Sequence, residues 1–331
     1  MVKTIQMRPG ARFGGELALL AALTALTRYV LRSHYLYDID SVNFALALER
    51  FDPVSHQPHP PGYFLYVCLG RLSRLVFQDT NSALVALSVL FSCGAVVVIA
   101  LLAAEWHGRA AARFAGLIFL FSPLAWFHGT VALTYIVEAF FSALTGFLCW
   151  RARTGGGRWV VAAAVTAGVG AGFRPSSLLL LGPLLLLSLE RAGAGLAAAG
   201  LAALGATVAA WFLPMTIMSG GSAWASSLWS LWTTVAGKTT AFNSSPLNSL
   251  ARAVTIAAIC GLAFGGAALL PLAAQSKNNT PDHHRNRFLL VWIAPGLLFF
   301  TFVFLKFVNS GYLLVLFPPV CVWMGAKAAS W

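Results

Sequence analysis

The sequence predicts an all-α fold, a polytopic transmembrane helical bundle of about ten spans, and three observations support this. Of the 331 residues, 59% are apolar and only 10% are charged, whereas a soluble domain carries about 25% charged residues. Apolar runs of about 17–25 residues, each long enough to cross a bilayer as a helix, recur along the chain. Within hydrocarbon every backbone amide must be paired inside the protein, which favours helices.

The apolar runs give the expected spans, and the whole chain, 1–331, is interpreted as a single transmembrane module. We place spans at 14–32, 82–104, 112–128, 131–150, 158–173, 176–189, 194–215, 251–274, 287–305 and 312–327. The net charge of +12 comes mainly from Lys and Arg in short loops, so it is a topology signal and predicts no nucleic-acid partner. The five cysteines stand singly without a CxxC spacing, which is typical of small core residues.

One apolar segment, 61–77, decides the topology. If it crossed the membrane, the Arg-rich turns 105–113 and 151–158 would lie outside, against the positive-inside bias. We therefore expect the N-terminus inside and 33–81 to be one long outer loop. Two interfacial helices, at 41–50 and 61–77, are expected within that loop.

Two further loops complete the predicted topology. The segment 216–250 is rich in Ser, Thr and Trp, which indicates a second outer loop with a helix in the headgroup layer. The polar stretch 275–287 is expected to be a cytoplasmic loop. No cleavable signal peptide is recognisable, so the first apolar run is expected to be a retained span.

The acids gather in the first outer loop, which holds five of the ten acids and three of the seven histidines. Either an aqueous loop simply collects polar residues, or these groups form a site. Asp40 or Ser41 can cap a helix that begins near Val42, and the helix dipole there favours a charged carboxylate. Such a carboxylate can accept a proton from an attacking hydroxyl group or hold a divalent cation.

A stiff run follows in the same loop, Pro58-His59-Pro60-Pro61-Gly62-Tyr63. Its three prolines fix φ, and its glycine allows an unusual turn before the next helix. The run can therefore hold His59 at a set place over the membrane surface.

The order of these features within 36–66 resembles bacterial members of the GT-C superfamily of membrane glycosyltransferases. The features are Asp40-Ser41, a helix, Phe-Asp-Pro and then His-Pro-Pro-Gly-Tyr. The branches it is most similar to are the protein O-mannosyltransferase-like and aminoarabinose-transferase-like ones. The resemblance implies that Asp40 acts on the acceptor or on a metal, with Asp38 as a second candidate. Asn43 stands where some relatives have Glu, which departs from a two-acid metal site.

Three later positions match the same pattern. An acid at a membrane boundary is costly unless it is paired or hydrated, so Glu138, beside Tyr135, is either a catalytic candidate or an interface residue. Arg174 suits phosphate through charge-assisted bonds, although lipid headgroups offer phosphate too. Lys306 with Tyr312 resembles the late outer turn of the family. The candidate substrate-binding residues are His56, His59, Tyr63, Tyr135 and Tyr312.

The resemblance implies transfer of a hexosyl or pentosyl group from a polyprenyl-phosphate donor to an acceptor lipid, glycan or protein. Arg174 and Lys306 would bind the donor phosphate, and Asp40 would take the acceptor proton, with inversion at the anomeric carbon. The expected place is the bacterial inner membrane, with the site facing the periplasm or the exterior. No cofactor is required by this mechanism, and a divalent cation near Asp40 is compatible with it.

Two other functions stay open at this point. A transporter or flippase for a lipid-linked or polar solute would place charges in the middle of its spans, often with internal repeats. A non-catalytic membrane subunit would tolerate substitution of Asp40 and Glu138.

Overall fold

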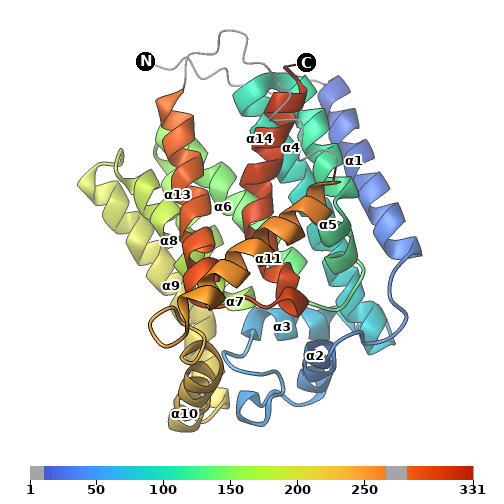
Figure 1. Cartoon of the computed structure of the whole chain (residues 1–331), viewed down its shortest axis with the longest axis vertical. Coiled ribbons are helices and arrows are strands. Elements are labelled where there is room, and N and C mark those ends of the chain that lie inside the picture. The colour runs from blue at the N-terminus through green and yellow to red at the C-terminus, as the bar shows by residue number, and fades with distance from the viewer. Residues whose placement is uncertain (1–10, 266–281, 331) are drawn as a thin grey trace.

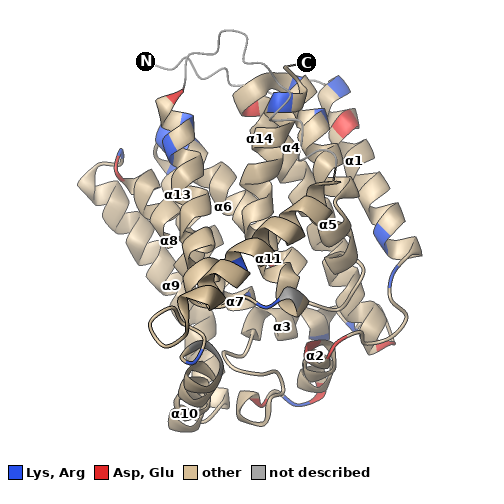
Figure 2. Cartoon of the chain, viewed as in Figure 1, with Lys and Arg blue, Asp and Glu red and all other residues tan. Residues whose placement is uncertain are grey.

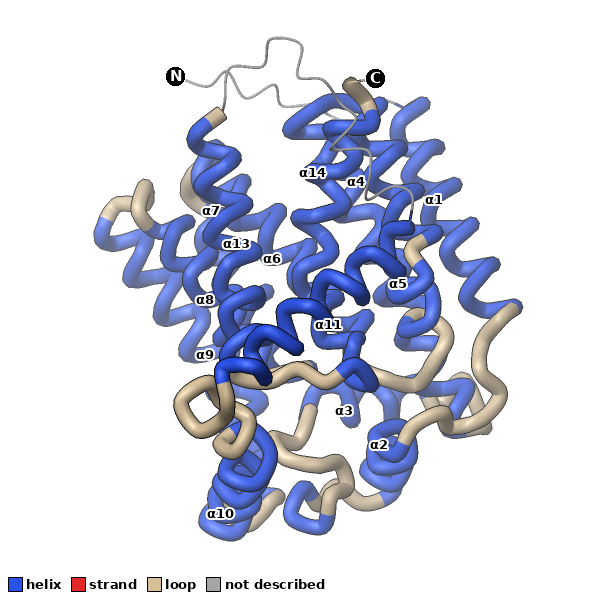
Figure 3. The backbone as a smooth tube through the Cα atoms, viewed as in Figure 1, coloured by secondary structure: helices blue, strands red, loops and turns tan. Residues whose placement is uncertain are grey.

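The computed structural model describes residues 11–265 and 282–330 as helices joined by turns and loops, without a strand in these two ranges (Figure 3). Most of the helices run between the two ends of one bundle (Figure 1). In chain order the elements are α1 (Ala11–Val30), α2 (Ile39–Glu49), η1 (Pro53–Ser55), α3 (Phe64–Ser73), α4 (Thr80–Phe121), α5 (Pro123–His128), α6 (Tyr135–Gly155), α7 (Arg158–Phe173), α8 (Ser176–Leu189), α9 (Ala194–Met218), α10 (Ser222–Leu231), η2 (Trp232–Ala236), α11 (Pro246–Phe264), α13 (His283–Phe302), η4 (Phe307–Leu316) and α14 (Phe317–Ala328). The predicted all-α bundle is confirmed.

Five of the described helical segments are long and apolar enough to cross a membrane. They are Ala11–Val30, Thr80–Phe121, Ala194–Met218, Pro246–Phe264 and Val308–Ala328. The predicted spans 158–173 and 176–189 coincide with α7 and α8, which are apolar but shorter. The predicted span 251–274 corresponds to α11, and its part from 266 onwards lies outside the described residues, as does the predicted loop 275–287 up to residue 281.

The 42-residue helix α4 is two antiparallel segments, because its path reverses at Gly108, where φ is 86°. The guanidinium of Arg109 lies 2.5 Å from the carboxylate of Glu16, near the start of α1. Further along, Arg28 near the end of α1 donates to the carbonyl of Leu120 over 2.6 Å. The second half of α4 therefore runs beside α1 in the same direction, as the two separate predicted spans 82–104 and 112–128 require.

The segment 61–77 does not cross the bundle. Its helix, α3, has ten residues and is about 15 Å long, half of the hydrocarbon thickness. It packs with α2 at one end of the bundle (Figure 1), where Arg71 donates to the carbonyls of Leu48 and Ala47 over 2.9 and 3.0 Å. We call this end, which carries α2, α3 and α10, the α2–α3 end.

The second predicted outer loop joins the first at this end. The indole of Trp224 in α10 donates to the carbonyl of Pro61 over 3.2 Å. Trp229 and Trp232 expose 67% and 45% of their surface, which suits side chains that lie in a headgroup layer. The two segments that were predicted to be outer loops thus lie together at the α2–α3 end of the bundle.

Charged residues gather towards the two ends of the bundle, and few lie between them (Figure 2). The end opposite to α2 and α3 is tied by ion pairs. The Glu105 and Arg151 side chains approach to 2.8 Å, and those of Glu190 and Arg287 to 2.6 Å. This end is held by contacts between its own side chains.

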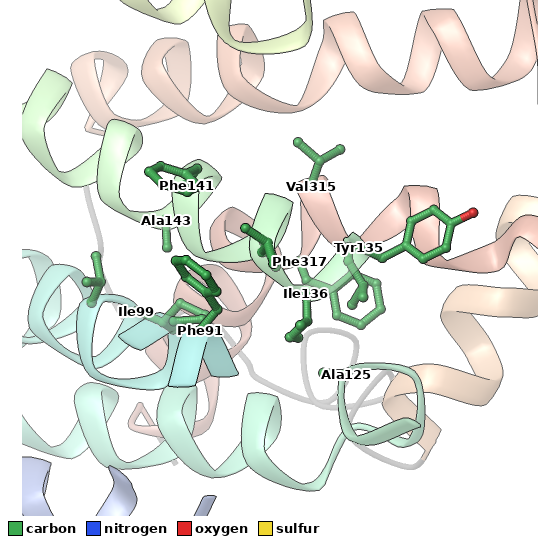
Figure 4. Packing of buried hydrophobic residues seen from close by; sticks show 14 of the residues in the cluster. Phe91, Ile99, Ala125, Tyr135, Ile136, Phe141, Ala143, Val315 and Phe317 are labelled. Carbon is green, nitrogen blue, oxygen red and sulfur yellow. The ribbon is translucent and has the colours of Figure 1, made fainter. Parts of the chain in front are cut away.

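In the core, α6 packs against α13 and against η4, the segment before α14. Phe91 of α4 and Phe141 of α6 pack with ring centroids 5.8 Å apart (Figure 4). The indole of Trp292 donates to Ser142 over 3.0 Å, and that hydroxyl donates to the carbonyl of Val315 over 2.6 Å. These contacts fix the start of α6 beside η4, which is where the candidate site lies.

Candidate active site

The site begins at the N-terminus of α2, where the predicted cap was wrong. The helix starts at Ile39, and neither Asp40 nor Ser41 caps it. Asp38 is the N-cap, because its extended backbone (φ −131°, ψ 159°) lets its carboxylate accept the amide of Asp40 over 2.9 Å. Asp40 therefore sits in the first turn, and its own carboxylate is available for partners outside the helix.

The stiff run brings His59 against that carboxylate. The Nδ1 atom of His59 lies 3.3 Å from Oδ1 of Asp40, and its Nε2 atom lies 3.0 Å from the hydroxyl of Tyr63. Burial lowers the pKa of His59 below its ordinary 6.5; Asp40 opposes this shift, and Arg174 adds to it. Near neutral pH the imidazole is therefore uncharged. It can orient the Asp40 carboxylate without neutralising the negative charge of that group.

A buried ion pair forms the opposite wall. Arg174 caps the end of α7, Glu138 lies in the first turn of α6, and they expose 3% and 1% of their surface. The guanidinium Nε lies 2.7 Å from the carboxylate, and Nη1 donates to the hydroxyl of Thr134 over 2.8 Å. Ser176 and Ser177 donate to the other carboxylate oxygen over 3.2 and 3.1 Å. Glu138 is thus ion-paired with Arg174 through one oxygen and accepts hydrogen bonds at the other, and it fixes Arg174.

Three tyrosines surround the guanidinium of Arg174. The carbon at its centre lies 4.4 Å from the ring centroids of both Tyr135 and Tyr312, and 6.0 Å from that of Tyr63. Aromatic faces attract a cation at these distances. They hold the charge in place at the wall of a cavity.

Some of these groups line one cavity of about 280 Å³, which we call the first cavity, whereas Asp40, Glu138 and Tyr135 do not line it. His59, Tyr63, Arg174, Ser176 and Tyr312 are its polar side chains. Its apolar lining comes from Pro60, Pro61, Pro175, Leu228, Leu231, Trp232, Phe299 and Phe304. An apolar wall around a single cation suits a ligand with a hydrocarbon part and an anionic group.

Six of the predicted residues do not line this cavity. Asp40, Glu138 and Tyr135 contact His59, Arg174 and Tyr312, which do line it, and Asp38 caps the helix that carries Asp40. The other two lie away from it. His56 is exposed, in a left-handed backbone conformation (φ 59°), because the turn points its side chain away from the bundle. Lys306 is exposed at the start of η4 and does not line the first cavity. Thr134, Ser176 and Ser177 were not predicted, although the last two follow Arg174 closely in the sequence.

The residues near Asp40 do not build a metal cage. Across the described ranges no group of three His, Cys, Asp or Glu side chains comes together. Divalent cations such as Mg²⁺ and Ca²⁺ take six or more oxygen ligands, several of them from the protein in dedicated sites. Asp40 instead faces one imidazole, and a carboxylate held in this way can accept a proton.

The helical bundle has the fold of the GT-C class of membrane glycosyltransferases, as solved structures show. The comparisons agree and confirm the predicted resemblance. Residues 55–194 match the family model described as the Protein O-mannosyl-transferase TMEM260 N-terminal domain. A search of the curated proteins by sequence finds no match.

Solved structures of this class superpose on almost the whole chain. ArnT from Cupriavidus metallidurans bound to undecaprenyl phosphate gives a TM-score of 0.69 at 15% identity, covering 95% of this chain and 60% of ArnT. The Archaeoglobus fulgidus oligosaccharyltransferase, tethered to an acceptor peptide with an NVT sequon, gives 0.56 at 15% identity, covering 95% and 49%. The chain thus shares their fold and spans about half to three-fifths of their length.

Proposed function

We propose that this chain is a membrane glycosyltransferase that moves a hexosyl or pentosyl group from a polyprenyl-phosphate donor to an acceptor. The observation that carries the proposal is the first cavity, which sets the Arg174 cation in an apolar wall beside the His59–Asp40 pair. The description of the matching family model and the undecaprenyl phosphate bound to ArnT support the same class of reaction.

The donor would fill the first cavity. Its isoprenoid chain would lie against the apolar lining, and its phosphate would face Arg174. Glu138 neutralises part of that charge, so we assign it the role of positioning the guanidinium and expect Arg174 to act mainly through directed hydrogen bonds. Lys306, exposed near the end of α13, would supply a second cation as the lipid enters.

The chemical step follows from the pair at α2. The carboxylate of Asp40 takes the proton of the acceptor hydroxyl group while its oxygen bonds to the anomeric carbon. The bond from that carbon to the phosphate oxygen breaks, and the polyprenyl phosphate leaves with the electron pair. Arg174 stabilises the charge that grows on the phosphate. Attack from the face opposite to the leaving group inverts the configuration.

The side of the membrane is part of the proposal. Nucleotide sugars are not available outside the cytoplasm, so a lipid-carried donor implies a site on the outer face. The α2–α3 end would face the periplasm or exterior of a bacterial inner membrane, because the Arg-rich turns 105–113 and 151–158 lie at the other end.

Asp40→Asn tests the assignment. In nanodiscs with a polyprenyl-phosphate sugar and an acceptor extract, we expect the transfer rate to fall by about 10²-fold or more, since a neutral amide cannot take the proton. The matched control is Asp79→Asn in the same outer loop. Asp79 caps α4, and Asn caps a helix equally well. Transfer at the normal rate by folded Asp40→Asn would exclude Asp40 as the base.

Chelation tests the metal question separately. Because Asp40 and His59 offer only two ligands, we propose that no divalent cation is needed and expect EDTA to leave the rate unchanged. A rate that EDTA abolishes and Mg²⁺ or Mn²⁺ restores would instead make Asp40 a metal ligand.

A further inference from the structure

A second cavity, of about 380 Å³, lies behind the tyrosines that surround Arg174. Its polar lining comes from separate parts of the chain: Asp38 before α2, His128 at the end of α5, Tyr135 at the start of α6, and Asn309 and Ser310 in η4. The proposed donor site does not use this cavity.

The two cavities share a wall and a neighbour. Tyr135 lines the second cavity and Tyr312 the first, and their ring centroids are 5.3 Å apart. Asp40 is joined to both sides, since its carboxylate faces His59 of the first cavity and its amide donates to Asp38 of the second. Asp40 itself lines neither cavity, but the residues that it contacts line both, which makes it the link between the two.

His128 is the observation that points to a ligand. Its side chain is 96% buried, because it exposes 4% of its surface, and neither ring nitrogen has a hydrogen-bond partner among the described residues. A buried polar group without a partner destabilises a fold, so such groups are nearly always satisfied by the protein, by water or by a ligand. Here the imidazole lines a cavity large enough for a ring-sized molecule.

The lining decides what kind of molecule fits. Among the described lining residues there is no Lys or Arg, and Asp38 is an acid, so a phosphate or carboxylate would be repelled. An imidazole, an amide, three hydroxyls and a carboxylate together offer both donors and acceptors. Tyr37 and Phe127, packed edge to face at 5.0 Å, add apolar ring surface. This mixture matches a neutral ring that carries several hydroxyl groups.

We propose that the second cavity binds a carbohydrate ring of the acceptor, so that the acceptor is itself a glycan or glycolipid. This proposal rests on the proposed function for its meaning, but its test does not need catalysis. One hydroxyl group of the bound ring would face Asp40, and His128 and Asn309 would bind hydroxyl groups farther from the reaction.

Photo-crosslinking tests the proposal directly. The probe is an octyl glucoside with a diazirine on its sugar, applied to the protein in nanodiscs, and the comparison probe is octanol with the same diazirine. Mass spectrometry is expected to find sugar-probe adducts on 127–135 and 308–310, competed by excess methyl glucoside. Equal labelling of these segments by the octanol probe would overturn the proposal, because it would show an apolar crevice only.

A pair of variants sharpens the result. Asn309→Ala removes one hydrogen-bonding group from the cavity, and we expect the competing methyl glucoside to bind about fivefold more weakly. Asn243→Ala removes the same group from an exposed loop at the same end and should leave competition unchanged. Thermal unfolding checks that both variants are folded. Unchanged competition in folded Asn309→Ala contradicts the assignment.

The two proposals fail separately. Sugar-specific labelling without any transfer from a polyprenyl-phosphate donor would refute the enzyme and leave the carbohydrate site standing. Transfer without sugar-specific labelling would refute the carbohydrate site and leave the proposed enzyme standing.

Discussion

At the scale of single residues, Arg174 and Glu138 depend on each other. Both side chains are buried, and their ion pair is completed by hydroxyl groups from Thr134, Ser176 and Ser177. A buried pair of this kind contributes little net stability, but breaking it leaves one charge without a partner. The site therefore needs both residues, although only Arg174 lines the first cavity.

We expect Glu138→Gln to lower the free energy of unfolding by about 3 kcal/mol, because it strands the guanidinium. The double variant Glu138→Gln/Arg174→Gln should recover much of that loss and still transfer no sugar. Denaturant unfolding of the purified protein measures the stability of the single and the double variant, and the transfer assay measures their activity. A single variant as stable as the parent would mean that the pair is hydrated in the membrane.

His59 predicts a dependence on pH. Its pKa is below 6.5 in the folded protein, so the unfolded chain binds the proton more readily, and the free energy of unfolding should fall as pH drops below 6.5. The parent should lose more stability between pH 7.5 and pH 5 than His59→Gln, which cannot titrate. Melting temperatures at the two pH values give the comparison, and equal losses would contradict the buried neutral imidazole.

At the scale of elements, the packing of α6 against α13 sets the position of the site. A β-carbon on Gly146 would lie 2.1 Å from the Trp292 ring, so Gly146→Ala must displace the indole that donates to Ser142. We expect a loss of about 1–3 kcal/mol. Gly205→Ala in α9, where a β-carbon meets nothing within 4 Å, is the control and should be neutral or slightly stabilising.

Helices were the part that sequence could predict well, because their signal is local. Apolar length and flanking turns predicted the first and last residues of α7 and α8 correctly. The first turn of α2 was misplaced by three residues, since Asp38, Asp40 and Ser41 are all good caps and the choice depends on the backbone before the helix. Segment 61–77 was predicted to be a surface helix from the distribution of arginines along the chain, which is an electrostatic signal. Its own hydrophobicity did not distinguish a surface helix from a span.

At the scale of the whole molecule, the fold predicts which loops share a side of the membrane. In a background without the native cysteines, His34→Cys and Val308→Cys should react with an impermeant maleimide from one side of a sealed vesicle. Gly193→Cys, near the Glu190 ion pair, should react only after the vesicle is opened. Labelling of all three from one side would contradict the topology.

The candidate site could be predicted in part. Its charged members stood out because only 10% of this chain is charged and only ten residues are acids, and the residues of the Pro58–Tyr63 run were visible as a motif. The second cavity could not be predicted, because Asp38, His128 and Asn309 come from segments about 90 and 180 positions apart, and ordinary polar residues give no signal until the chain is folded. Whether each residue acts as proposed stays a prediction.

The short helix η4 has a consequence for kinetics. It supplies Asn309 and Ser310 to one cavity and Tyr312 to the other, so a shift of one turn moves the walls of both. Donor and acceptor are then expected to influence each other's affinity, and by thermodynamic linkage each must do so by the same factor. Saturating the protein with one substrate should change the dissociation constant of the other. Such coupling would favour the state in which donor and acceptor are both bound before the reaction begins.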